Sequence, residues 1–201
     1  MGPITSYGRL HGALAQMDRV LHLQCRCQGF EPLMLHNSIY NKLKFMILSS
    51  ILFTVMVGVF ISYVLFIWTK YGIQKSISES YYVLPKKENF LFILFCWLFA
   101  FPAMLLGDSY LMLFAGGGIV FVGASAAMHT FPTRMAHLIG AIGGMILACL
   151  AMIFQYHMWY MVAGIAGLIP VAYLLDKKHL FWWIEVMIFT AISTVIGISL
   201  L

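Results

Sequence analysis

Residues 46–69 read MILSSILFTVMVGVFISYVLFIWT and contain no charged side chain. A helix of about 20 consecutive apolar residues is long enough to cross the hydrocarbon core of a bilayer. Trp68 and Tyr71 lie at the end of this stretch, and such aromatic residues are typical of the boundary between lipid and water. The segment therefore predicts a transmembrane helix.

The composition of the whole chain points to the same class. Of its 201 residues, 62% are hydrophobic and only 9% are charged, whereas about 25% of the residues in a soluble domain are charged. Lipid must therefore supply the outer surroundings of the fold. The net charge of +5 lies in the N-terminal region and the short loops, where we expect contacts with anionic lipid headgroups and no binding of nucleic acid.

Five more apolar segments follow the first. The expected fold is all-α, a polytopic membrane helical bundle with six transmembrane helices in one domain over residues 46–201. Residues 1–45 form a more polar N-terminal tail, which we expect to be partly disordered or to hold a short amphipathic helix. The six spans are expected at about 46–69, 90–107, 110–128, 137–155, 158–175 and 180–201.

Small residues dominate the third and fourth spans. Small side chains let membrane helices approach closely, and Gly140 and Gly144 stand in a Gly-x-x-x-Gly frame. We expect these two spans to pack at the centre of the bundle. The predicted packing residues are Gly116, Gly117, Gly118, Gly123, Gly140 and Gly144.

Six crossings would place the first, third and fifth connections on one side of the membrane. Glu185 follows the fifth connection and lies roughly 8 Å into the last span, at the rise of an α-helix. A carboxyl group at that depth needs a proton or a partner, which His137, Lys178 or Tyr82 could supply. Ionisable groups inside a membrane are functional-site candidates by default.

The ionisable and polar residues on that side form a candidate binding or proton site, but most of them could instead have a purely structural role. Ser78 could cap a short helix, His137 could hold a loop by one hydrogen bond, and Glu185 could belong to a buried structural pair. The candidate residues are Ser78, Glu79, Tyr82, His137 and Glu185.

No metal or cofactor is expected. Cys25 and Cys27 in the tail lack a second cysteine pair, and their spacing from His22 and His36 matches no zinc pattern.

Three short motifs carry a resemblance. They are SISESYYVLPKKENFLFILFCW at 76–97, FVGA at 121–124 and HLIGA at 137–141. Together they resemble a bacterial family of uncharacterised six-span membrane proteins, and more remotely the eukaryotic Frag/DRAM/Sfk group. In that group an Ile-Ser-Asp loop precedes the second span, and a His-x-x-Gly-Ala motif opens a later one.

The resemblance places Ile77-Ser78-Glu79 at the Ile-Ser-Asp position, with Glu79 in place of Asp, and residues 137–141 at the His-x-x-Gly-Ala motif. It implies a six-span helical fold in a bacterial inner (cytoplasmic) membrane. The wider group is associated with lipid remodelling, membrane trafficking and autophagy, and no reaction is defined for it.

Three functions remain open on this sequence. The preferred one is an accessory protein, not an enzyme, that binds membrane lipids, a protein partner or a second copy of itself through the polar cluster. The second is a small proton-linked transporter that uses Glu185 and His137. The third is an intramembrane metal-dependent hydrolase built on Ser78, Asp108 and His137, which Asp108 disfavours because it falls on the opposite side.

Overall fold

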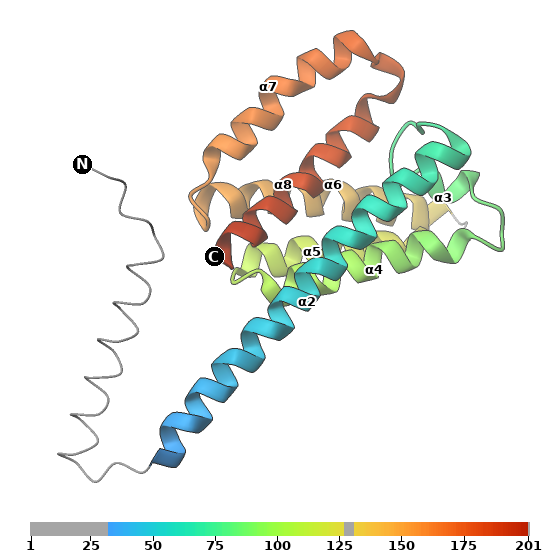
Figure 1. The fold of residues 1–201 in the computed structure, drawn as a ribbon. Helices are drawn as coiled ribbons and strands as arrows, with labels where there is room; N and C mark the ends of the chain where they lie inside the picture. The colour runs from blue at the N-terminus through green and yellow to red at the C-terminus, as the bar shows by residue number, and fades with distance from the viewer. Residues whose placement is uncertain (1–31, 127–130, 201) are drawn as a thin grey trace, which may run out of the picture. The chain divides into compact units, whose positions relative to one another are not determined.

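The computed structural model describes residues 32–126 and 131–200, and over these ranges the chain is helical without any strand (Figure 1). The helical class predicted from the sequence is therefore confirmed. The elements are α2 (Pro32–Tyr71), α3 (Ser80–Val83), α4 (Asn89–Leu106), α5 (Tyr110–Ala126), α6 (Phe131–Phe154), α7 (Trp159–Leu175), the 3-10 turn η1 (Lys177–His179) and α8 (Leu180–Ser199).

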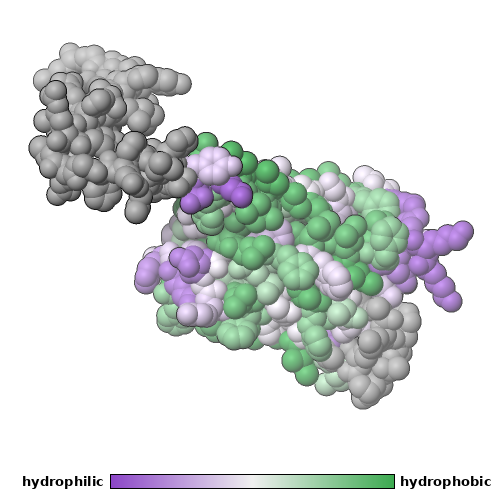
Figure 2. Space-filling view, turned by 90° about the horizontal axis from the view of Figure 1, so that it is seen from below, coloured by the Kyte–Doolittle hydropathy of each residue, from purple (hydrophilic) through white to green (hydrophobic). Residues whose placement is uncertain are grey.

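Within the described residues, four helices are long and apolar enough to cross a membrane. They cover Tyr40–Tyr71, Asn89–Leu106, His137–Phe154 and Lys177–Ser199. Two more apolar helices, Tyr110–Ser125 and Trp159–Leu175, are shorter. The face seen in Figure 2 is largely hydrophobic, and hydrophilic side chains gather at its edges.

Large apolar side chains on the outside agree with a lipid environment. Leu174 is 83% exposed and Leu175 is 81% exposed. A soluble protein rarely leaves a large continuous apolar surface open to water. Every residue of α7 is at least partly exposed. The four long apolar helices and this exposed apolar surface are compatible with a helical membrane protein.

The chain divides into two compact units, residues 1–47 and residues 48–201. In the first unit the described residues form the beginning of α2, which starts at Pro32, well before the predicted span at Met46. Proline is well tolerated at the first position of a helix. Lys42 and Lys44 continue the helix because lysine is a good helix former. The amphipathic helix considered within the N-terminal tail lies outside the described residues.

Helix α2 ends at a glycine. Gly72 has a φ of 75°, a backbone conformation that glycine adopts without the steric cost of a Cβ atom. Its N–H donates to the carbonyl of Trp68 at 3.1 Å, which closes the helix in the manner of a glycine C-cap. The chain then turns into the first connection, residues 72–88.

The predicted close packing of the two glycine-rich helices is visible between α5 and α6, the most extensive helix contact in the described part of the chain. A Cβ atom on Gly118 would lie 2.9 Å from the carbonyl oxygen of Gly140 and 3.0 Å from the Cα atom of Gly144. One on Gly144 would lie 3.2 Å from the carbonyl oxygen of Ala115. The two backbones approach so closely that no side chain fits between them.

The other predicted packing glycines divide between two kinds of surroundings. Gly116 and Gly123 face α4, where Cβ atoms would meet Met104 and Cys96. Gly117 departs from the prediction, because no described atom lies within 4 Å of where its Cβ atom would be. It sits on the face of α5 turned away from these neighbours.

Aromatic rings join α2, α4 and α8 in the core of the second unit. Tyr63 stacks on Phe95 with ring centroids 4.4 Å apart, and Phe60 stacks on Phe189 at 5.5 Å. Phe99 meets Phe189 edge to face at 4.7 Å. Such ring pairs add to the free energy gained by burial alone, so this cluster holds α8 against the first two long helices.

Candidate functional site

The centre of the site is the carboxyl group of Glu185, which α8 carries in its second turn and which is only 8% exposed. Its Oε2 atom accepts hydrogen bonds from the backbone N–H groups of Ile77 and, at 3.2 Å, Ser78. The Oε1 atom accepts from the Ser78 hydroxyl at 3.2 Å. Two successive N–H groups that point at one anion form a recognised anion-binding arrangement. Glu185 is thus held by the first connection.

A second bond attaches the same connection to α8. The backbone N–H of Trp182 donates to the carbonyl of Lys75 at 3.0 Å. The first amides of a helix have no partner within the helix, and here the first connection supplies one. Trp182 is 2% exposed. The segment from Lys75 to Ser78 therefore packs directly against the start of α8.

Two serines fix the shape of the connection. The Ser76 hydroxyl accepts from the N–H of Glu79 at 2.9 Å, and the Ser80 hydroxyl bonds to the Tyr63 hydroxyl of α2 at 2.6 Å. Ser76 therefore provides the turn that precedes α3, the role considered for Ser78 from the sequence. Ser78 is turned toward Glu185 instead.

A cavity with a volume of about 40 Å³ lies below this connection. Helices α4, α5, α6 and α8 all contribute to its wall, and most of the wall is apolar, with Phe92, Ile119, Met145 and Ile192 among the lining residues. Ser78 and Glu185 lie at its polar end. The site is thus an apolar space closed on one side by a hydrogen-bonded carboxyl group.

The structure does not pair His137 with Glu185. The Nδ1 atom of His137 lies 3.5 Å from the hydroxyl of Ser125, which itself donates to the carbonyl of Val122 at 3.1 Å. These contacts join the beginning of α6 to the end of α5, and His137 does not line the cavity. The interpretation that fits His137 is the structural one, a hydrogen bond between neighbouring helices.

The remaining predicted residues lie at the edge of the site. Glu79 is half-buried and follows Ser78 directly in the chain. Tyr82 is 52% exposed and meets the ring of Tyr81 edge to face at 5.5 Å. Lys178 is exposed. Of the three partners considered for Glu185 from the sequence, none takes that place, because backbone amides and the Ser78 hydroxyl do.

Two polar contacts outside the cavity hold the ends of helices. Lys70 donates to Glu88 at 2.7 Å and Tyr71 donates to it at 2.8 Å, and the Lys70 bond is the main reason why the pKa of Glu88 is lowered. His179 bonds to Asp176 at 2.8 Å, which is the main cause of a lowered pKa for Asp176.

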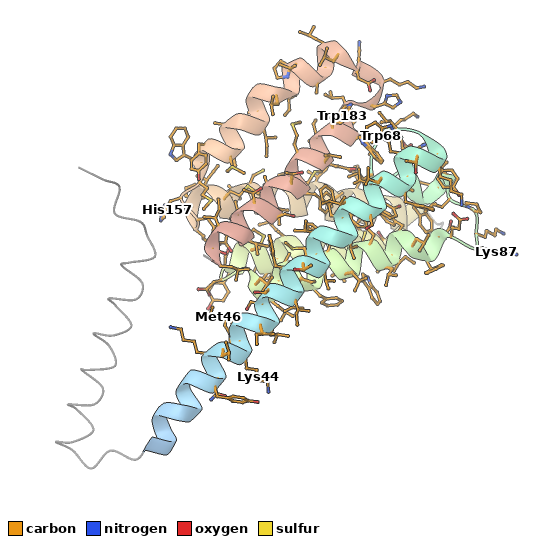
Figure 3. The ribbon with its side chains drawn as sticks, in the orientation of Figure 1. Lys44, Met46, Trp68, Lys87, His157 and Trp183 are labelled. Carbon is orange, nitrogen blue, oxygen red and sulfur yellow. The ribbon has the colours of Figure 1, made fainter. Side chains whose placement is uncertain are left out.

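The first and fifth connections lie at the same end of the second unit, whereas the third connection, which was predicted to join them, includes residues outside the described ranges. Figure 3 shows Trp68 and Trp183 at the end that holds the first and fifth connections, and His157 at the other end. His157, with a φ of 54°, lies in the turn between α6 and α7. Among the described residues no three His, Cys, Asp or Glu side chains form a group that could hold a metal ion.

Sequence reasoning missed the partner of Glu185 and the roles of Ser76 and Ser80. A signal was present in residues 76–80, SISES, where serine recurs at every second position up to the first residue of α3. Such hydroxyls commonly bond to nearby backbone groups in turns. Which of them would instead reach α8 is not encoded in that pattern.

Comparison with protein-family models, with curated proteins and with solved structures finds no match for this chain. The fold and the site therefore define its class, an all-helical protein whose four long apolar helices indicate a membrane location.

Proposed function

We propose that this chain is a six-span integral membrane protein that binds the apolar chain of a membrane lipid, or of a lipid-like molecule, in the cavity beside Glu185. The observation that carries the proposal is the combination of an apolar wall from four helices with a single polar end at Ser78 and Glu185. Ligand sites typically join an apolar surface to a few placed polar groups.

The six crossings rest on helix length and composition. Helices α5 and α7 have 17 residues each, and the range for transmembrane helices begins at about 17. Both are apolar and lie between helices that are long enough to cross. With six crossings the polar end of the cavity, at Ser78 and Glu185, lies near one side of the membrane.

The volume of the cavity sets what enters it. A single water needs roughly 10–15 Å³ of such space, so about 40 Å³ accommodates a few small groups. That suits one end of a lipid-like molecule, such as a terminal hydroxyl or amine with the carbon atoms next to it, and not a whole lipid. Met145 lines the space, and the flexible side chain of methionine adapts to ligands of different shape.

The polar end selects the chemistry of the ligand. A carboxylate offers about four lone-pair positions, and Ile77 and Ser78 occupy three of those on Glu185. The remaining position fits a hydrogen-bond donor, such as a hydroxyl or ammonium group. We therefore expect amphiphiles with an alcohol or amine to bind more tightly than those with a carboxylate.

The family resemblance noted in the sequence belongs to the same proposal. Its support is that Ile77 and Ser78 of the Ile-Ser-Glu motif are the residues that bind Glu185. The buried carboxyl group at a cavity also favours a second candidate, a small proton-linked transporter, because ionisable groups inside membranes often mark such pathways.

The test is labelling of the purified protein in lipid vesicles by a photoreactive long-chain alcohol. We expect labelled peptides to contain Ile119, Met145 or other lining residues. Ala141→Leu, which places a larger side chain on the cavity wall, should abolish this labelling. Ala163→Leu, the same change on the exposed face of α7, should leave it intact. Labelling confined to outer surfaces in every variant would refute the binding proposal.

A further inference from the structure

Three side-chain oxygen groups form a continuous hydrogen-bonded row at the polar end of the cavity. The Ser76 hydroxyl lies 3.1 Å from the Ser78 hydroxyl, which lies 3.2 Å from Oε1 of Glu185. Each hydroxyl can donate one hydrogen bond and accept others. The row begins at the half-buried Ser76 and ends at the buried Glu185.

We propose that Ser76 and Ser78 form a proton relay that connects Glu185, and with it the cavity, to the surface at the first connection. The inference goes beyond lipid binding and does not depend on what fills the cavity. It gives the buried carboxyl group a defined path along which a proton enters and leaves.

The transfer balances in protons and in hydrogen bonds. With Glu185 ionised, Ser76 donates to Ser78 and Ser78 donates to Oε1. A hydronium ion at the surface transfers a proton to the Ser76 oxygen and is left as water, the original Ser76 proton moves to Ser78, and the original Ser78 proton moves to Oε1. One O–H bond forms on the carboxyl group, and both hydrogen bonds of the row reverse direction. The reverse sequence releases the proton to water.

The bonds that hold the connection in place remain unchanged during this transfer. The N–H groups of Ile77 and Ser78 bind Oε2, the other oxygen of the carboxyl group. The N–H of Glu79 donates to Ser76 at 2.9 Å, and that bond requires only a lone pair on the serine. The row can therefore exchange a proton without opening the loop.

Other ionisable groups near Glu185 come from three elements. Glu79 follows Ser78 in the first connection, Cys96 of α4 lines the same cavity as Glu185, and Tyr63 of α2 lies next to the connection through its bond to Ser80. The cavity-lining residues contributed by α5 and α6 carry no ionisable side chain. Within the described site Glu185 is thus the one carboxyl group that borders both the cavity and the relay.

The experiment is a pH jump on the full chain in lipid nanodiscs, followed by time-resolved infrared absorption of carboxyl groups. Glu185→Gln identifies the Glu185 band by removing it. Ser78→Ala keeps both backbone amides but cuts the relay, so its band should respond about a hundredfold more slowly, the lower end of the range for loss of a positioned proton-transfer group. Ser78→Thr keeps the hydroxyl and should restore the rate.

Two further variants make the result decisive. Ser76→Ala cuts the row farther from Glu185 and should slow the response of the Glu185 band in the same way. It therefore tests the relay even if Ser78→Ala does not fold. Ser199→Ala removes a hydroxyl that bonds only within the last turn of α8 and should titrate like the wild type. Wild-type rates in both relay variants, or a Glu185 band that never responds to pH, would overturn the proposal. Lipid labelling is measured separately, so either proposal can fail alone.

Discussion

The attachment of the first connection to Glu185 leads to a quantitative prediction for Glu185→Leu. Leucine leaves the N–H groups of Ile77 and Ser78 without their acceptor, and Ile77 is only 1% exposed, so water cannot replace it there. A buried unsatisfied donor costs about 1–3 kcal/mol. Because Ser78 is half-buried and regains part of its bonding from water, we expect a total destabilisation of about 2–4 kcal/mol. Ser78 can also turn its hydroxyl to Ser76, which limits further loss.

The assay has a global and a local readout. Unfolding in mixed micelles measures the change in free energy, and limited trypsin digestion reports whether the exposed Lys75 becomes cleavable when the connection detaches from α8. We expect a new fragment that ends at Lys75 in Glu185→Leu. Glu185→Gln keeps an acceptor oxygen for the amides and should show a smaller effect of about 1 kcal/mol.

The matched control is Glu79→Leu, which removes a carboxyl group from the same connection. The side chain of Glu79 forms no hydrogen bond to the part of the chain that the structure describes, so this variant should remain resistant at Lys75. The reasoning is refuted if Glu185→Leu unfolds at the wild-type denaturant concentration and is cleaved no faster at Lys75.

The remaining predictions concern packing, pH and a buried hydroxyl. Gly118→Ala places a methyl group against the backbone of α6 and should destabilise the fold by about 1–3 kcal/mol, whereas Gly117→Ala meets nothing and should be neutral or stabilising by up to about 1 kcal/mol; unfolding in mixed micelles compares the two. The hydrogen bonds from the end of α2 lower the pKa of Glu88 below its ordinary value of 4.5. Their stabilisation is therefore complete above pH 4.5 and lost as pH falls through the lower, folded-state pKa, and acid titration of Glu88→Gln should lack this component. Tyr63→Phe removes one hydrogen bond to Ser80 and should cost about 0.5–1.5 kcal/mol in the same unfolding assay, and a loss near zero would show that this bond contributes nothing.

The helices were predictable because their signal is local. Long apolar runs such as 46–69 predict helix and membrane location without knowledge of neighbours. The extension of α2 back to Pro32 was not predicted, since Lys42 and Lys44 suggest an end to a membrane span although they do not end a helix. Hydrophobicity predicts which part of the helix lies in lipid. Helix propensity is a different property, and it determines how far the helix continues beyond the lipid.

The glycine run shows where local reasoning stops. Gly117 and Gly118 are the same residue type and are adjacent in the sequence, but only Gly118 faces α6. Which side of a nearly uniform apolar helix turns inward depends on its partner. Amphipathicity, the usual guide, is almost absent from α5 because lipid and core are both apolar.

The candidate site was predictable in part for a similar reason. Glu185 and Ser78 stood out because polar groups near lipid require an explanation. The partner of Glu185 could not be read from side-chain types, because it is largely backbone. Every residue carries an N–H group, and only the folded path of the first connection aims two of them at this carboxylate.

The tie between Ile77 and Glu185 joins residues 108 positions apart, and this has a consequence for biosynthesis. At about 5–20 residues per second, a ribosome makes Ile77 several seconds before Glu185. During that interval the first connection emerges without its acceptor, and only insertion of the last helix supplies it. The first connection therefore cannot reach its final hydrogen-bonded form before α8 has been made, however early the connection itself is synthesised.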